Sequence, residues 1–189
     1  MAFYLEEEQL LRFLRARDFK LAPTVEMHEA WVRWRLTYKA DMIRPTEIRE
    51  LLLKQTLMLG PITKDNKLSL LVRTRYHVPG DHDIDDLMRY GIFCVEQAMK
   101  RIKEEDRNPQ IACIYDRTGM TGANRDSQIV KMAYRMIGTL QDFYCERLGE
   151  FIVIGANTAF WIANGLIKPF LAKKTREKIK LVYKDEELL

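Results

Sequence analysis

Short apolar segments alternate with longer helical patterns through the last two thirds of this sequence. The apolar segments predict strands at residues 68–78, 110–115, 151–154 and 178–183. The helical patterns that separate them cover residues 84–105, 125–147 and 156–171. Strands of this composition are typical of parallel sheets, whose faces are covered by helices. The alternation therefore predicts an α/β fold with a mixed or parallel sheet, covered by helices on at least one face.

The first third of the sequence has the apolar periodicity of helices. Apolar residues recur at helical spacing within residues 6–19, where acidic residues come first and basic residues last, as the helix dipole favours. A second helix is expected after Pro23, and a third after Pro45 with Thr46 as its N-cap. Three helices therefore precede the alternating part.

At Gly60 and Pro61 the sequence changes from helical periodicity to alternating strand and helix patterns. We expect a helical N-terminal region at residues 1–59 and an α/β domain at residues 60–189. A chain of 189 residues suits one domain with a small helical appendage, because typical domains hold roughly 100–200 residues.

One uncharged run, residues 151–167, is at the lower edge of the length that spans a bilayer, which is about 20 residues. The run contains Asn157 and Asn164, and amides at bilayer depth are costly. A buried strand followed by an apolar helix is the better prediction. At the N-terminus, the acidic residues 6–8 interrupt any signal-peptide pattern, so secretion is not implied.

Cysteine content and net charge indicate in which compartment the protein is expected and which class of partner is not expected. Cys94, Cys113 and Cys145 are odd in number and show no C-x-x-C spacing, which favours a reducing, cytoplasmic location without disulfides. The formal net charge of +4 is mild beside that of a dedicated nucleic-acid binder. We therefore expect no nucleic-acid partner.

Candidate catalytic patterns fail one by one. The only serines, Ser69 and Ser127, lie outside any G-x-S-x-G motif. Residues 119–122 resemble a phosphate loop, but no Gly-Lys-Ser/Thr follows them. The three histidines are too scattered for a metal set, and Cys113, within an apolar strand, is expected to be an inert thiol. The sequence predicts no enzyme, no cofactor and no metal.

An apolar helix followed by a basic segment stands out in the last third. Its large apolar side chains are Phe160, Trp161, Leu166, Ile167, Phe170 and Leu171. Between residues 160 and 180 there are six basic residues and one acid. The pattern fits a core helix followed by a solvated turn. It also fits an apolar gate bordered by cations, suited to an anionic membrane surface or a phosphate headgroup.

Four motifs together resemble the CRAL-TRIO lipid-binding family. They are L-R-F-L-R-A-R at residues 11–17, E-R-L-G at 146–149, K-P-F-L at 168–171 and T-x-x-K-I at 175–179. The resemblance implies a helical N-terminal region on an α/β domain whose sheet forms the floor of a hydrophobic cavity. It also implies that residues 156–171 are a mobile gate helix, with a lipid's acyl chains enclosed behind the apolar side chains of that helix.

Within this family, the branch of yeast-type phosphatidylinositol/phosphatidylcholine transfer proteins carries a headgroup-binding set. The positions that match it here are Arg17, Glu146, Arg147, Thr175 and Lys178, although Cys145 replaces the usual proline. A cation and a hydroxyl suit a phosphate, and a carboxylate suits inositol hydroxyls. Thr175 and Lys178 are three apart, so on one helical turn they would point the same way.

Two features limit what the resemblance implies. Ile111 and Cys113 stand where that branch has two small hydroxyl residues for phosphatidylcholine, so phosphatidylcholine is not expected as a second ligand. The resemblance instead places both residues in the floor of the acyl-chain cavity. The alternative role of Arg17, Glu146 and Lys178 is an ion-pair set that braces a helix against the domain. Family members also extend further at both ends, so we expect a minimal or trimmed domain.

We therefore expect a non-enzymatic, monomeric protein of the cytoplasm that associates peripherally with anionic membranes. It would bind and transfer one phospholipid, phosphatidylinositol, by burying its acyl chains in a gated cavity. Two alternatives stay open at this point. The ligand is another hydrophobic molecule, such as a tocopherol, retinoid, sterol or fatty acid, or the chain is a membrane-binding or protein-binding module.

Overall fold

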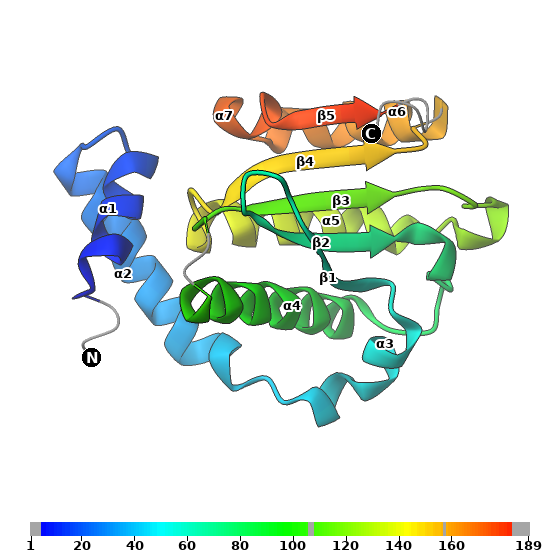
Figure 1. Ribbon diagram of the computed structural model, residues 1–189, viewed down its shortest axis with the longest axis horizontal. Helices are drawn as coiled ribbons and strands as arrows, with labels where there is room; N and C mark the ends of the chain where they lie inside the picture. Colours follow the sequence, from blue (N-terminus) through cyan, green and yellow to red (C-terminus); the bar gives the residue numbers. More distant parts are fainter. Residues whose placement is uncertain (1–4, 106–107, 157, 183–189) are drawn as a thin grey trace.

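Figure 1 shows the computed structural model of the chain, which describes residues 5–105, 108–156 and 158–182. A single five-stranded sheet has the order β1-β2-β3-β4-β5. The strands are β1 Leu57–Ile62, β2 Leu68–Arg73, β3 Ile111–Asp116, β4 Leu148–Ile154 and β5 Ile179–Val182. β1 pairs antiparallel with β2, and the other neighbours are parallel. The predicted mixed sheet within an α/β fold is confirmed.

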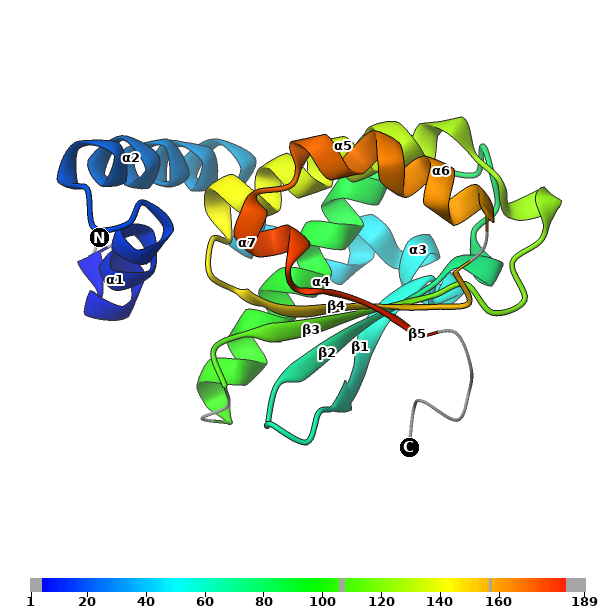
Figure 2. The same ribbon diagram turned by 90° about the horizontal axis from the view of Figure 1, so that it is seen from above.

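Seven α-helices accompany the sheet in the described residues. They are α1 Glu7–Ala16, α2 Leu21–Tyr38, α3 Arg49–Lys54, α4 Ile84–Glu104, α5 Ser127–Phe143, α6 Thr158–Ile167 and α7 Lys173–Arg176. In Figure 2, α4, α5 and α6 lie on the same side of the sheet, while α1 and α2 lie at one end of the molecule. The fold is thus one helical layer on one sheet, with a helical pair beside it.

The main core lies between α4 and the sheet. Leu68 and Leu70 of β2 and Ile111 of β3 pack against buried residues of α4, among them Tyr90 and Val95. These strand residues share one face, because Leu68 pairs with Ile111 and side chains alternate along a strand. Burial of this apolar surface is the main source of stability for the domain.

A buried ion pair joins the N-terminal helices to the domain. The Arg35 guanidinium of α2 donates to both carboxylate oxygens of Glu96 on α4, at 2.8 and 3.1 Å. The Tyr144 hydroxyl, just after α5, also donates to Glu96. Trp34 stacks on Phe143 with ring centroids 4.6 Å apart. These contacts attach α2 to α4 and α5, since a buried charge requires its partner.

Proline positions account for two differences from the predicted helices. α2 begins at Leu21 rather than after Pro23, because a proline within the first helical turn lacks only an N–H that has no intrahelical acceptor. Thr46 is not an N-cap. It lies in the 3-10 helix η3, Pro45–Ile48, whose N-cap is Arg44, and α3 begins only at Arg49.

Strand β1 was not predicted, because Gly60 and Pro61 look like a break in the sequence. Both residues lie inside β1, where the register against β2 shifts between Leu59 and Ile62. An edge strand tolerates proline, since its outer N–H groups need no partner strand. The division of the chain into regions at residue 60 remains a prediction.

Other elements differ from the prediction in length: β4 begins three residues earlier than expected, at Leu148, whereas several elements are shorter. β2 ends at Arg73, and α5 covers only Ser127–Phe143. α6 ends at Ile167 and continues as the 3-10 helix η6, Lys168–Phe170, because Pro169 cannot continue the α-helical hydrogen bonding. The last predicted residue of the final strand, Tyr183, lies outside the described residues.

Candidate functional site

The α6–η6 segment carries an exposed apolar surface. Trp161, Ile162, Leu166 and Phe170 are all exposed, whereas Phe160 and Leu171 are buried and Ile167 is half-buried. Phe160 lies under the Arg117 guanidinium, 5.4 Å from the ring centroid. Among the described residues, no helix is long and apolar enough to cross a membrane. Exposed apolar surfaces of this kind are typical of contact sites for a partner, a ligand or a membrane.

Two polar side chains of α5 hold the end of this segment. The Tyr134 hydroxyl donates to the Leu166 carbonyl oxygen at 2.7 Å, and its ring meets the Phe170 ring edge-on at 4.7 Å. The Gln141 amide donates to the Phe170 carbonyl oxygen at 3.1 Å and accepts the Ala172 N–H at 2.7 Å. The sequence analysis missed both residues, although their separation of seven places them on one helix face.

A groove lies between α5 and η6. Its volume is about 440 Å³, and it is lined by Tyr134, Ile137, Gly138, Gln141 and Phe170. A side chain at Gly138 would meet nothing within 4 Å, so α5 leaves open space there. Small-molecule sites have volumes of roughly 300–1,000 Å³. The groove is large enough for part of an extended apolar ligand.

The predicted cavity-floor residues lie on β3. Ile111 is buried in the core beneath α4, and Cys113 is the residue in register with Leu70 and Phe151. Burial raises the pKa of the Cys113 thiol to about 12, so this thiol stays protonated at neutral pH. This direction agrees with the expectation of an inert thiol, which stays a prediction.

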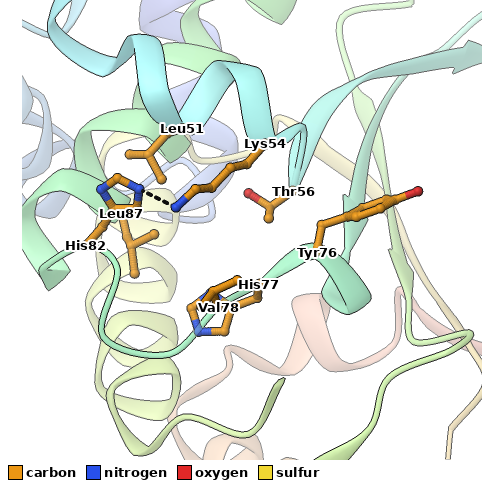
Figure 3. Close-up of a pocket in the computed structure, with 8 residues that line it drawn as sticks. All are labelled: Leu51, Lys54, Thr56, Tyr76, His77, Val78, His82 and Leu87. Atoms are coloured by element: carbon orange, nitrogen blue, oxygen red, sulfur yellow. Dashed lines mark hydrogen bonds between the residues drawn. The ribbon is translucent and has the colours of Figure 1, made fainter. Parts of the chain in front are cut away.

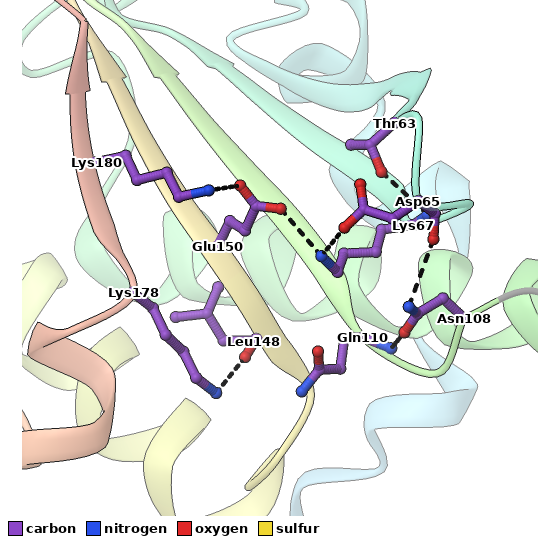
Figure 4. Close-up of polar contacts among 9 residues, drawn as sticks. All are labelled: Thr63, Asp65, Lys67, Asn108, Gln110, Leu148, Glu150, Lys178 and Lys180. Carbon is purple, nitrogen blue, oxygen red and sulfur yellow. Dashed lines mark hydrogen bonds and ion pairs between the residues drawn. The ribbon is translucent and has the colours of Figure 1, made fainter.

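The predicted headgroup residues gather where β4 and β5 begin. The Lys178 Nζ donates to the Leu148 carbonyl oxygen at 2.5 Å, as Figure 4 shows. Thr175 and Lys178 do not share a helical turn, because α7 ends at Arg176. Instead, the Lys178 N–H donates to the Thr175 carbonyl oxygen at 3.2 Å and closes a turn. Both side chains still lie at the same end of the sheet.

Arg17 and Glu146 approach this place from other elements. Arg17 is the C-cap of α1, and its neighbour Asp18 forms an ion pair with Lys174 of α7 at 2.9 Å. The Asp18 carboxylate, and more weakly that of Glu146, raises the pKa of Lys174. Glu146 itself has a left-handed backbone, with φ of 61°. The Asp18–Lys174 ion pair therefore links the end of α1 to α7.

Arg147 makes structural contacts instead. Its guanidinium forms an ion pair with Glu8 of α1 at 2.7 Å and donates to the Pro109 carbonyl oxygen at 3.2 Å. These contacts hold α1 and the loop before β3 against the start of β4. The assignment of Arg147 to a headgroup site stays a prediction.

The sequence analysis also missed a buried cation, Arg12. Its Nη1 donates to the Phe143 carbonyl oxygen at 3.1 Å, and its guanidinium lies over the rings of Phe13 and Trp31. Loss of hydration lowers the pKa of Arg12 to about 10. The contact fixes α1 against the end of α5, directly before Glu146. A polar residue within the apolar stripe of the first helix was the available signal.

A second cavity, shown in Figure 3, is of a different kind. It lies among α3, the loop after β2 and the start of α4, with His77 and His82 in its lining, and its volume is about 10 Å³. Lys54 Nζ lies 3.0 Å from His82 Nε2, and His77 Nε2 lies 3.0 Å from an Asp126 carboxylate oxygen. This space holds about one water molecule, so it cannot hold a lipid.

Comparison with known proteins decides the family. The CRAL/TRIO domain model matches residues 54–189. The chain belongs to the CRAL/TRIO family. Members of this family bind and transfer lipids, and the resemblance found in the sequence is thereby confirmed.

Individual relatives of this CRAL/TRIO chain are distant. Patellin-4 of Arabidopsis thaliana is 27% identical over 173 residues, which cover 89% of this chain and 32% of the relative. A CRAL-TRIO domain-containing protein of Schizosaccharomyces pombe is 28% identical over 188 residues, with 93% and 41% covered. The chain thus spans about a third to two fifths of these relatives.

The crystal structure of Sfh5 shares the fold of this CRAL/TRIO chain. The two superpose with a TM-score of 0.77 at 19% sequence identity, over 95% of this chain and 65% of the other. At this identity the similarity concerns the fold. The α/β fold, with its helical N-terminal region and mixed sheet, is therefore shared with that structure.

Proposed function

We propose that this chain binds phosphatidylinositol, with its acyl chains behind the α6–η6 segment and its headgroup at the start of β4 and β5. It transfers the lipid between membranes without catalysing a reaction. It acts as a monomer in the cytoplasm, associated reversibly with anionic membrane surfaces. The three cysteines, free in the structure, support a reducing compartment.

The observation that supports this proposal is that contacts of their neighbours join the segments carrying Arg17, Glu146 and Lys178. The Asp18–Lys174 ion pair and the Lys178–Leu148 hydrogen bond bring the three elements together. A lysine, an arginine and a hydroxyl suit a phosphodiester, and a carboxylate accepts hydrogen bonds from inositol hydroxyls. No single helix or strand could present this combination.

The apolar surface of α6–η6 supports the transfer step. Trp161, Leu166 and Phe170 are exposed to water, at a cost that contact with a bilayer would relieve. The groove behind Phe170 provides the entry for an acyl chain. Burial of an acyl chain contributes ~0.8 kcal/mol per CH₂, so the chains supply affinity and the headgroup contacts decide specificity.

Transfer of fluorescent phosphatidylinositol between vesicles tests the proposal. Thr175→Val keeps the shape of the side chain and removes the hydroxyl, and Lys178→Met keeps most of the stem and removes the charge. Each is expected to lower transfer by about tenfold, since a hydrogen bond to a charged group contributes ~1.5–3 kcal/mol. Lys100→Met, which removes an exposed lysine of α4, is the matched control.

Circular dichroism and urea unfolding establish that each variant is folded. Wild-type transfer by both Thr175→Val and Lys178→Met would remove the headgroup assignment. Native mass spectrometry of the co-purified ligand tests the lipid class directly. A phosphate-free ligand, such as a sterol or a tocopherol, would contradict phosphatidylinositol and favour a carrier of another hydrophobic molecule.

A further inference from the structure

The turn between α1 and α2 exposes two large apolar side chains. Phe19 is 66% exposed and Leu21 is 72% exposed, and basic residues Arg17 and Lys20 adjoin them. Neither apolar side chain belongs to the two buried clusters of the fold. Exposed apolar residues next to cations are the composition that binds at an anionic membrane surface.

The backbone of the turn is unusual for the residues it carries. After α1, the Phe19 N–H donates to the Leu14 carbonyl oxygen at 2.8 Å, and the Asp18 N–H donates to that of Arg15 at 3.4 Å, a Schellman arrangement. Asp18 and Phe19 are both left-handed, with φ of 50° and 59°. A bulky residue rarely adopts this conformation.

The turn also lies beside the basic segment that follows the gate. The Asp18–Lys174 ion pair, at 2.9 Å, joins it to α7, where Lys173 and Arg176 are also exposed. Exposed ion pairs contribute only ~0–1 kcal/mol, so this pair shows the proximity of the two segments more than it enforces it. Phe170, 61% exposed, precedes α7 by three residues.

We propose that the α1–α2 turn is a second membrane-contact element, which inserts Phe19 and Leu21 into an anionic bilayer while α7 meets the lipid phosphates. This inference deepens the proposed function and rests on it. The N-terminal helices then orient the protein on the membrane, so that the gate segment faces the bilayer. Basic residues on both sides of the Asp18–Lys174 pair supply the charge complementarity.

Vesicle flotation tests the proposal. The probe is vesicles of phosphatidylcholine with phosphatidylserine, compared with phosphatidylcholine alone. The variant Phe19→Asn/Leu21→Ser removes both apolar groups, and asparagine suits the left-handed position. The matched control is Met42→Ser/Leu53→Ser, because these residues are 66% and 69% exposed. α3, which carries Leu53, lies away from α7 in Figure 1.

The turn variant is expected to lower partition onto anionic vesicles by about tenfold, which corresponds to ~1.4 kcal/mol, while the control binds like wild type. Wild-type partition of the turn variant, or an equal loss in the control, would overturn the proposal. A turn that binds a protein would give the first of these results.

Binding of a short-chain, water-soluble phosphatidylinositol separates this proposal from the proposed function. The turn variant is expected to keep wild-type affinity for it, because the turn acts on membrane contact alone. A parallel loss of this affinity would overturn the proposal for the turn. If the wild-type chain binds no soluble phosphatidylinositol, the proposed ligand is wrong, and the flotation result still decides the role of the turn.

Discussion

Gly149 has no side chain, so the side chain of Lys67 can pass close to the start of β4. Replacement of Gly149 by alanine tests whether this close approach matters for stability. A Cβ at Gly149 would lie 2.9 Å from Cε and 3.0 Å from Cδ of Lys67, and 3.2 Å from Oε1 of Gln110. The residue stands at a β-bulge, since Ile111 and Ala112 of β3 pair with residues 148 and 150 of β4. The glycine of the E-R-L-G motif therefore leaves room for the side chain of Lys67, which a Cβ would displace.

Displacement of Lys67 would break its ion pair with Glu150. The two groups are 3.0 Å apart, and their side chains are only 11% and 16% exposed. Loss of a charged hydrogen bond costs ~1.5–3 kcal/mol, and alanine regains ~0.5–1 kcal/mol that glycine loses in a strand. Glu150 keeps Lys180 at 2.8 Å. We expect Gly149→Ala to lower the free energy of unfolding by about 1–2 kcal/mol.

Urea unfolding at neutral pH measures this change. Gly122→Ala is the control, because a Cβ at Gly122 would meet nothing within 4 Å. In a Lys67→Ala background the two nearest crowding atoms are gone and only Gln110 Oε1 at 3.2 Å remains, so Gly149→Ala should cost less there. An equal cost of Gly149→Ala in both backgrounds would refute the role of Lys67.

The effect of pH gives an independent check. Lys180 and then Lys67 lower the pKa of Glu150 in the folded state. This depressed pKa stabilises the fold above the unfolded carboxyl pKa of about 4.3, and the stabilisation is lost as pH falls through the folded value. The difference between wild type and Gly149→Ala should therefore shrink in acid. A difference that stays constant down to the acid limb would contradict the ion-pair explanation.

Three further predictions concern the stability of the fold and the accessibility of its sheet. Glu96→Ala leaves buried Arg35 without its bidentate partner and should lower the unfolding free energy by about 3 kcal/mol in urea; a loss below 1 kcal/mol would contradict this. Asp83 accepts the Asp86 N–H as the N-cap of α4, so Asp83→Ala should cost ~1 kcal/mol by thermal unfolding. Cys113 should react with a thiol reagent at mild alkaline pH only after unfolding, and rapid labelling of the native chain would show that this strand is accessible.

The periodicity of apolar residues correctly predicted helices and strands that bury one continuous face. α4 begins at Ile84 as expected, with Asp83 as its cap, because both the apolar pattern and the capping signal are local. β1 was missed, since an edge strand tolerates Gly60 and Pro61, which the local pattern assigns to a turn. Prediction from the sequence pattern thus fails where pairing with another strand, rather than local preference, determines the backbone conformation.

In the candidate site, some features could be predicted from local sequence and others depend on the fold. The motifs located Thr175 and Lys178, but not the hydrogen bond from Lys178 to Leu148, which depends on β4 and β5 being neighbours. The pairing of Arg147 with Glu8 was equally invisible, because these residues lie far apart in the chain. A motif gives the chemical groups at a site, whereas their partners follow only from the fold.

In the proposed function, the gate is held closed by a small number of hydrogen bonds. Tyr134 makes one and Gln141 makes two to the main chain around Phe170. Each contributes ~0.5–1.5 kcal/mol net, so the three together contribute about 1.5–4.5 kcal/mol. Insertion of Trp161 and Phe170 into a bilayer would each contribute up to ~1.5–3 kcal/mol. The two sums are of similar size, so contact with the membrane supplies enough free energy to open a segment that stays closed in water.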